Sequence, residues 1–124
     1  MITHLTEALT ELKESLDGDL FFDDLHKTLY ATDASVYRQI PAGVAFPKSE
    51  QDIQQLILFA EKNKIGIIPR TAGTSLAGQC VGDGLVVDVS KYFTEVIALD
   101  VHNKTVTVQP GVIRDELNRF LEPH

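Results

Sequence analysis

Residues 69–84 read PRTAGTSLAGQCVGDG, a glycine-rich loop that directly follows the apolar pair Ile67-Ile68. Glycine and other small residues let a ligand approach the backbone closely, and successive N–H groups in such a loop can form a concave anion site. Arg70 adds a positive charge suited to phosphate. The loop also carries the hydroxyls of Thr71, Thr74 and Ser75. The stretch predicts a site for a phosphate-bearing ligand; the alternative is a flexible turn between two strands.

The loop departs from two widespread phosphate-binding motifs. Gly73 and Gly78 have the GxxxxG spacing of a P-loop, but Gln79 and Cys80 stand where that motif needs Lys and then Ser or Thr. The GxGxxG motif is also missing, because Gly82-Asp83-Gly84 continues into an apolar strand and not into a helix. Nucleotide triphosphate hydrolysis is therefore not predicted, and a nucleotide would have to bind through a different kind of loop.

The residues before the loop predict a strand, a helix and a second strand. Val44–Pro47 is a short strand that ends at proline, and Ser49 and Asp52 have the spacing of a helix N-cap. The helix has its apolar face at Ile53, Leu56, Ile57 and Ala60, and its end at Lys62, Lys64 and Gly66. This order favours a parallel pair of strands with a right-handed crossover, and places the loop at the carboxyl end of the second strand.

The remaining pattern predicts one more strand, a hairpin and two helices. Leu85–Val89 is a buried strand, and a turn at 102–104 joins the two arms of the hairpin. The hairpin alternates through Ile97, Leu99, Val101, Val106 and Val108. The last helix has the apolar face Ile113, Leu117, Phe120 and Leu121. The first helix has the apolar face Leu5, Leu9, Leu12 and Leu16, with Thr3 as its N-cap and Gly18 as its stop. The predicted fold class is α/β (α+β), a small, mostly parallel sheet flanked by helices plus a β-hairpin.

Four segments in a fixed order resemble a known family. They read AFPKSEQDIQQLILFAEKNKIGIIPRTAGTSLAGQ (45–79), GLVVDVSK (84–91), TVTVQPGV (105–112) and IRDELNRFL (113–121). Together they resemble the first subdomain, or first half, of the two-part FAD-binding domain of the vanillyl-alcohol oxidase and p-cresol methylhydroxylase type. This FAD-linked oxidase family includes glycolate oxidase subunits and D-lactate dehydrogenases. The ordered set is more specific than a glycine-rich loop alone.

The resemblance implies which residues hold FAD. In the family, the loop matching Arg70–Gly78 binds the FAD pyrophosphate through backbone N–H groups, and the turn 110–112 lies beside the flavin; the alternative for that turn is a plain strand stop. Some members attach FAD covalently through a histidine where this chain has Thr74, so FAD is expected to be non-covalent. The expected cofactor-binding residues are Pro69, Arg70, Thr71, Ala72, Gly73, Thr74, Ser75, Leu76, Ala77, Gly78, Gln79, Pro110, Gly111 and Val112.

The segment LYATDASVYRQIP (29–41) resembles the lead-in of D-lactate and related 2-hydroxy-acid dehydrogenases. In those proteins it can lie near the cofactor, so Asp33, Ser35 and Tyr37 are further candidates, with a structural turn as the alternative. By the same resemblance, residues 1–40 are a helical lead-in, and residues 41–124 are the first half of an FAD-binding domain truncated before its second half and the substrate cap.

The whole protein is expected to be an FAD-dependent oxidoreductase that oxidises a small 2-hydroxy acid such as D-lactate, glycolate or D-2-hydroxyglutarate. Its catalytic residues are expected outside this chain, which is itself expected to be inactive, and its electron acceptor is not specified by these residues. Two alternatives stay open. One is a non-catalytic module that binds a nucleotide phosphate, and the other is a structural subunit of a multichain oxidase.

The composition limits which partners, metals and compartments are expected for this chain. The net charge of −7 argues against nucleic acid as the main partner. The four histidines are far apart, and no HxH, HExxH or CxxC spacing occurs, so no metal site is predicted. The single cysteine, Cys80, fits a reducing compartment. The charged amino terminus does not read as a signal peptide and no apolar run is long enough for a membrane span, so a cytoplasmic protein is expected.

Overall fold

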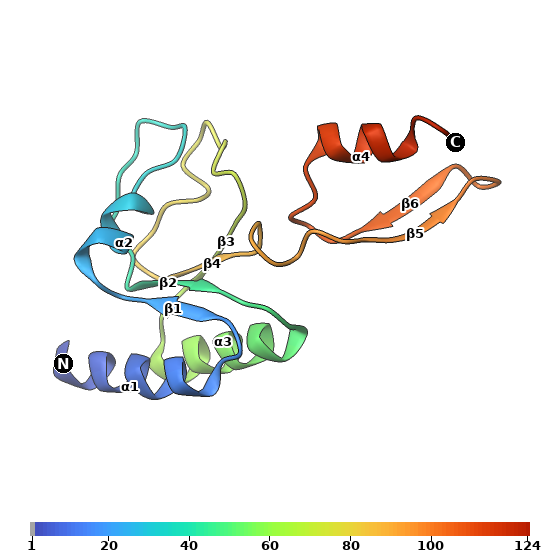
Figure 1. Cartoon of the computed structure of the whole chain (residues 1–124). Coiled ribbons are helices and arrows are strands. Elements are labelled where there is room, and N and C mark those ends of the chain that lie inside the picture. The colour runs from blue at the N-terminus through green and yellow to red at the C-terminus, as the bar shows by residue number, and fades with distance from the viewer. Residues whose placement is uncertain (1) are drawn as a thin grey trace.

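A four-stranded sheet forms the centre of the larger part of the molecule (Figure 1). The computed structural model describes residues 2–124, with side chains from His4 onward. The strands lie in the order β1 (Asp19–Phe21), β2 (Gly43–Phe46), β4 (Leu85–Asp88) and β3 (Ile67–Arg70). β1 is antiparallel to β2, and the other neighbouring strands are parallel. The mostly parallel sheet predicted from the sequence is confirmed.

The strand that follows the glycine-rich loop lies between the two strands that precede it. The predicted parallel orientation of β2 and β3 is confirmed, but the two strands are not neighbours, because each of them pairs with β4. Every residue of β4 is buried, so this strand is suited to the inside of the sheet. Pro69 in β3 has no N–H to donate, and such a residue is tolerated at a sheet edge.

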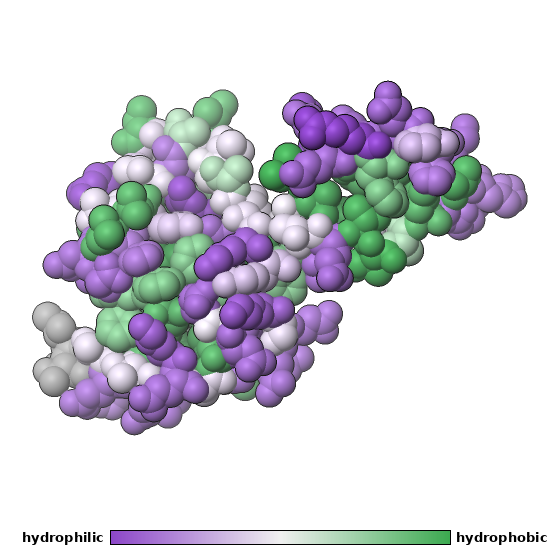
Figure 2. Space-filling view, viewed as in Figure 1, coloured by the Kyte–Doolittle hydropathy of each residue, from purple (hydrophilic) through white to green (hydrophobic). Residues whose placement is uncertain are grey.

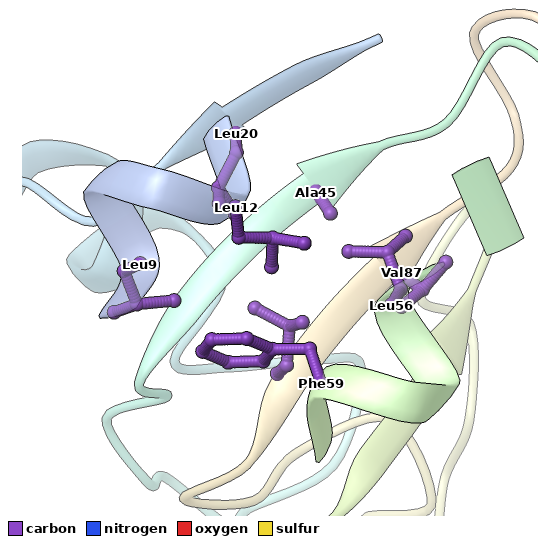
Figure 3. Close-up of a cluster of buried hydrophobic side chains, with 8 residues drawn as sticks. Leu9, Leu12, Leu20, Ala45, Leu56, Phe59 and Val87 are labelled. Atoms are coloured by element: carbon purple, nitrogen blue, oxygen red, sulfur yellow. The ribbon is translucent and has the colours of Figure 1, made fainter. Parts of the chain in front are cut away.

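Two helices cover one face of this sheet and form the core with it. In Figure 1, α1 (Ile2–Ser15) and α3 (Glu50–Asn63) both lie below the strands. Figure 3 shows the side chains that gather between these helices and the sheet. The cluster comprises Leu9, Leu12, Leu20, Ala45, Leu56, Phe59, Leu85 and Val87. Leu5 and Leu16 are partly buried against it, so the leucine stripe predicted for the first helix packs into the core.

Three details of the helices differ from the sequence prediction. α1 already begins at Ile2, so Thr3 is not its N-cap. On α3 the buried stripe is Asp52, Leu56, Phe59 and Ala60, while Ile57 is 51% exposed. Ile57 lies one residue, about 100° of helix rotation, past Leu56, which turns its side chain away from the sheet. The left-handed residue that ends α3 is Lys64, at φ 57°, and not Gly66.

Asp52 joins the start of α3 to the turn between α1 and β1. Its backbone N–H donates to Ser49 Oγ at 3.1 Å, which confirms the predicted N-cap. Its carboxylate is 1% exposed and accepts from the N–H groups of Asp17 at 3.0 Å, Gly18 at 2.9 Å and Lys48 at 2.8 Å. A side chain at Gly18 would lie 2.2 Å from the carbonyl oxygen of Phe46, so the turn can approach Asp52 only with glycine there.

The lead-in contains two elements that the sequence analysis did not predict. They are the three-residue strand β1 and the short helix α2 (Asp24–Leu29). Asp23 caps α2, where its side chain accepts from the N–H of His26 at 3.1 Å. A three-residue strand is too short to show a period, and only its pairing with β2 makes it part of the sheet. The lead-in therefore contributes α1 and β1 to the same sheet and core, while α2, which has no buried residue, lies against β2.

The last third of the chain forms an arm that projects from the sheet (Figure 1). The predicted hairpin is β5 (Val96–Asp100) with β6 (Thr105–Val108), followed by α4 (Arg114–Leu121). The predicted alternation in β5 is wrong, because a bulge between Val96 and Ala98 shifts the register and leaves Ile97 60% exposed. The predicted apolar face of α4 is only half-buried at Leu117 and Leu121, and no residue of α4 is fully buried.

Candidate functional site

The glycine-rich loop leaves the carboxyl end of β3 and returns to the start of β4. Figure 1 shows it beside the lead-in loop that follows α2, on the opposite side of the sheet from α1 and α3. Gly73 and Gly78 have φ values of 67° and 77°, a left-handed conformation that favours glycine. Gly73 is buried, whereas Thr71, Ala72 and Thr74 around it are exposed. The loop thus has a buried floor and exposed flanks.

The first half of the loop presents unpaired backbone donors. Within the described residues, the N–H groups of residues 72–76 donate to no other group of the chain. The second half is closed by Ser75, whose hydroxyl oxygen accepts from the N–H of Ala77 at 3.3 Å and that of Gln79 at 3.1 Å. The same hydroxyl donates to the Gln79 side chain. Successive free N–H groups suit an anion, while the Ser75 hydroxyl is already used inside the loop.

The side chain of Arg70 supports the glycine-rich loop. Its Nη1 donates to the carbonyl oxygen of Thr32 at 2.8 Å and more weakly to that of Cys80 at 3.5 Å. Its guanidinium carbon lies 4.9 Å from the centre of the Tyr30 ring. A Cβ at Gly73 would come within 2.5 Å of Arg70 Nη2, so the loop lies directly on the guanidinium. The predicted phosphate-binding charge of Arg70 is therefore committed to contacts within the protein.

The lead-in loop packs against the glycine-rich loop. The N–H of Ala34 donates to the carbonyl oxygen of Gly73 at 3.0 Å. Asp33 accepts from the N–H of Ser35 at 2.8 Å and from that of Cys80 at 3.4 Å, and hydrogen bonding from Ser35 holds the pKa of Asp33 below its usual value. A Cβ at Gly78 would lie 2.7 Å from the Tyr37 ring. The three lead-in residues singled out from the sequence thus build this loop pair.

The turn 110–112 forms the opposite wall of a cleft. The cleft has a volume of about 470 Å³ and is lined by Thr71, Ala72, Ser90, Pro110, Gly111, Val112, Ile113 and Arg114. Figure 2 shows the hollow between the loops on the upper left and the arm with α4 on the upper right. Two segments predicted separately from the sequence therefore line one cleft. The N–H of Gly111 donates to Phe93 at 2.8 Å, and a Cβ there would lie 2.5 Å from the Val89 carbonyl oxygen.

A buried carboxylate supports the cleft at the end of β4. Asp88 accepts from the Tyr30 hydroxyl at 2.6 Å, and from the N–H and hydroxyl of Ser90 at 2.8 and 2.6 Å. Burial, together with the hydrogen bond to Asp88, raises the pKa of Tyr30 well above its usual value. Ser90 lines the cleft, so this network fixes part of its wall. No role for Tyr30 is predicted from the sequence; the available signal is Asp88, a carboxylate within an otherwise apolar strand.

The remaining candidates lie apart from this cleft. Cys80 is a free, half-buried thiol. The Nδ1 atom of His26, on α2, lies 2.8 Å from Oδ2 of Asp23, and His102 lies in the exposed hairpin turn. Among residues 2–124, no group of three His, Cys, Asp or Glu side chains is placed to hold a metal ion. In the same part of the chain, no helix is both long and apolar enough to cross a membrane.

Comparison with known proteins agrees with this architecture. The FAD binding domain family matches residues 41–124. The chain is 37% identical to a D-2-hydroxyglutarate dehydrogenase of Haemophilus influenzae over 125 residues, which cover 98% of this chain and 12% of that protein. It is 34% identical to the mitochondrial D-lactate dehydrogenase [cytochrome] of Kluyveromyces lactis over 130 residues, or 95% of this chain and 23% of that protein. The chain therefore spans only a small part of these relatives.

A solved structure shows the same fold. p-Cresol methylhydroxylase with substrate bound superposes with a TM-score of 0.82 at 15% sequence identity, over 98% of this chain and 25% of that one. The fold is thus that of a part of p-cresol methylhydroxylase. Since the family match covers more than half of its residues, the chain belongs to the FAD binding domain family, and FAD is the cofactor of that family. The resemblance drawn from the four sequence segments is confirmed.

Proposed function

We propose that this chain binds the pyrophosphate of FAD in its glycine-rich loop and places the flavin side of the cofactor against the turn 110–112. The observation that carries the proposal is the run of unpaired N–H groups at residues 72–76, next to a cleft whose other wall is that turn. Arg70, the lead-in loop and the hydroxyl of Ser75 hold these donors in place before the ligand arrives. Donors that are already ordered lose less entropy on binding.

We also propose that FAD binds to this protein without a covalent bond. By the resemblance, Thr74 stands where covalently linked members of the family carry histidine, and threonine lacks the ring nitrogen that forms the bond to the flavin in those members. Protein denatured after FAD loading is expected to release all of its flavin. Flavin that stays with the denatured polypeptide would contradict this part of the proposal.

For the whole protein we propose a flavin-dependent dehydrogenase that oxidises a small 2-hydroxy acid. The two relatives named above act, by their names, on D-2-hydroxyglutarate and D-lactate, which share a hydroxyl next to a carboxylate. The flavin supplies the two-electron redox chemistry, and the residues of this chain bind it, orient it and exclude water. The single cysteine supports a reducing compartment, and we extend the proposal to the cytoplasm.

The test is a titration with FAD, followed by quenching of flavin fluorescence, of the protein as its gene encodes it. Ala72→Asp puts a carboxylate on the wall of the cleft, and Thr107→Asp makes the same change of charge on the exposed side of β6. We expect Ala72→Asp to weaken FAD binding by at least about tenfold through like-charge repulsion, and Thr107→Asp to leave it unchanged. Equal affinities for the two variants would contradict the site.

The reaction needs a separate measurement. Adding D-2-hydroxyglutarate, D-lactate or glycolate to the FAD-loaded protein under anaerobic conditions is expected to bleach the visible flavin absorbance with one of them. A protein that binds FAD but is bleached by none would support the non-catalytic module and contradict the dehydrogenase.

A further inference from the structure

We propose that Arg114, and not Arg70, provides the positive charge that binds the FAD pyrophosphate. This inference rests on the proposed function and names the cationic partner of the same site. The pyrophosphate is an anion, and the 124 residues of this chain carry a net charge of −7. A local cation at the site would offset the repulsion from the acidic residues of this chain.

Arg70 is not available for this role. Its guanidinium lies beneath Gly73, donates to the carbonyl oxygen of Thr32 and stacks on Tyr30. Turning it toward the cleft would break these contacts and remove the support of the very loop that carries the free N–H groups. Arg70 is also not among the residues that line the cleft.

Arg114, unlike Arg70, lines the cleft. It is the first residue of α4 and lies on the wall of the cleft that faces Thr71 and Ala72. Of the eight residues that line this cleft, Arg114 is the only one with a charged side chain. The free N–H groups begin at Ala72, so the guanidinium and the backbone donors approach one ligand from two sides. Arginine is suited to this position because its planar fork can contact two phosphate oxygens at once.

Arg114 is also free to move to a ligand. Its ion-pair partner among the described residues is Asp115, with 3.7 Å between Arg114 Nε and Asp115 Oδ1. Both side chains are largely exposed, at 88% and 72%. An exposed pair of this kind contributes little to stability, so the guanidinium can leave it at small cost. This separates Arg114, which can reorient, from Arg70, which is fixed.

The experiment compares Arg114→Gln with Arg119→Gln in FAD titrations of the protein as its gene encodes it. Both variants remove one positive charge. Arg119 is exposed on the same helix and does not line the cleft, so its variant is the matched control. We expect Arg114→Gln to weaken FAD binding by about tenfold or more and to flatten its salt dependence. Arg119→Gln is expected to stay within about twofold of the wild type, and Arg114→Lys to retain part of the affinity because it keeps the charge.

Competition separates a phosphate contact from a general disturbance of the cleft. ADP, which carries a pyrophosphate, is expected to compete with FAD less well in Arg114→Gln than in the wild type, while competition by adenosine stays the same. Equal losses for ADP and adenosine, or equal affinities of Arg114→Gln and Arg119→Gln, would overturn the role of Arg114 and leave the FAD site standing. A wild-type protein that does not bind FAD would instead overturn the proposed function itself.

Discussion

The guanidinium of Arg70 donates a 2.8 Å hydrogen bond to the carbonyl oxygen of Thr32, a residue 38 positions earlier in the chain. This bond ties the end of β3 to the lead-in loop. A glycine-rich loop without such support would sample many conformations, because glycine restricts the backbone least. The tie therefore turns a flexible segment into an ordered row of donors.

Arg70→Lys tests whether the shape of this side chain matters. Lysine keeps the charge but cannot reproduce the planar fork between Thr32, Tyr30 and Gly73. We expect FAD affinity to fall by about tenfold, from the loss of a hydrogen bond to a charged group. The control is Arg38→Lys, at an exposed position of the lead-in loop, which is expected to bind FAD as the wild type does. Unchanged FAD affinity in Arg70→Lys would show that the loop orders without the fork.

Asp52→Ala is expected to lower the free energy of unfolding by about 2–4 kcal/mol, measured by urea titration. The reason is that three backbone N–H groups, those of Asp17, Gly18 and Lys48, lose their acceptor in a buried position. Glu61→Ala removes an exposed carboxylate from the same helix and is the matched control. A loss no larger than that of the control would mean that the three donors find water instead.

Gly111→Ala is expected to destabilise the protein and to weaken FAD binding together. The added Cβ would lie 2.5 Å from the carbonyl oxygen of Val89 and 2.6 Å from that of Phe93, so the turn must move away from the cleft. Overpacking of this kind costs about 1–3 kcal/mol. Gly66→Ala adds a Cβ that meets no atom within 4 Å, and it is expected to leave thermal unfolding and FAD binding unchanged. Identical behaviour of the two alanine variants would refute the packing argument.

Tyr30→Phe is expected to change how stability depends on alkaline pH. Burial and the bond to Asp88 raise the pKa of Tyr30 in the folded state, so the neutral phenol is favoured there. The unfolded chain loses this proton near pH 10, the ordinary value for tyrosine, while the folded chain keeps it. The contribution is therefore complete below about pH 10 and declines as the pH rises further.

Denaturant unfolding of the wild type and Tyr30→Phe across this pH range checks the prediction. The free energies of unfolding of the two proteins are expected to differ most below pH 10 and to converge above it. A difference that stays constant with pH would show that Tyr30 ionises as easily in the folded protein as in the unfolded chain.

Local patterns were sufficient for much of the fold. The leucines of α1 recur at helical spacing, Ser49 marks the start of α3, and both are found as predicted. These features depend on neighbours within a few residues, which a sequence displays directly. β1 has only three residues and α2 only six, too few to show a period, and they were not predicted.

The order of the strands could not be read in the same way. A helix between β2 and β3 predicts that they are parallel, but not that β4 lies between them. That choice depends on which strand is buried on both faces in the folded protein, and every residue of β4 is buried. The bulge in β5 could not be predicted from the sequence either, because it arises from pairing with β6 and not from the residues of β5 alone.

For the site, the sequence by itself determined the type of loop, since glycines and small residues at 72–78 allow backbone conformations and close approaches that other residues forbid. It also determined the family, because the four segments keep their order. Only the tertiary structure decided that the turn 110–112 faces this loop across one cleft. It also decided that Arg70 is used for support while Arg114 lines that cleft. The physical reason is that a side chain's charge is visible in the sequence, whereas the contacts that occupy it come from residues distant along the chain.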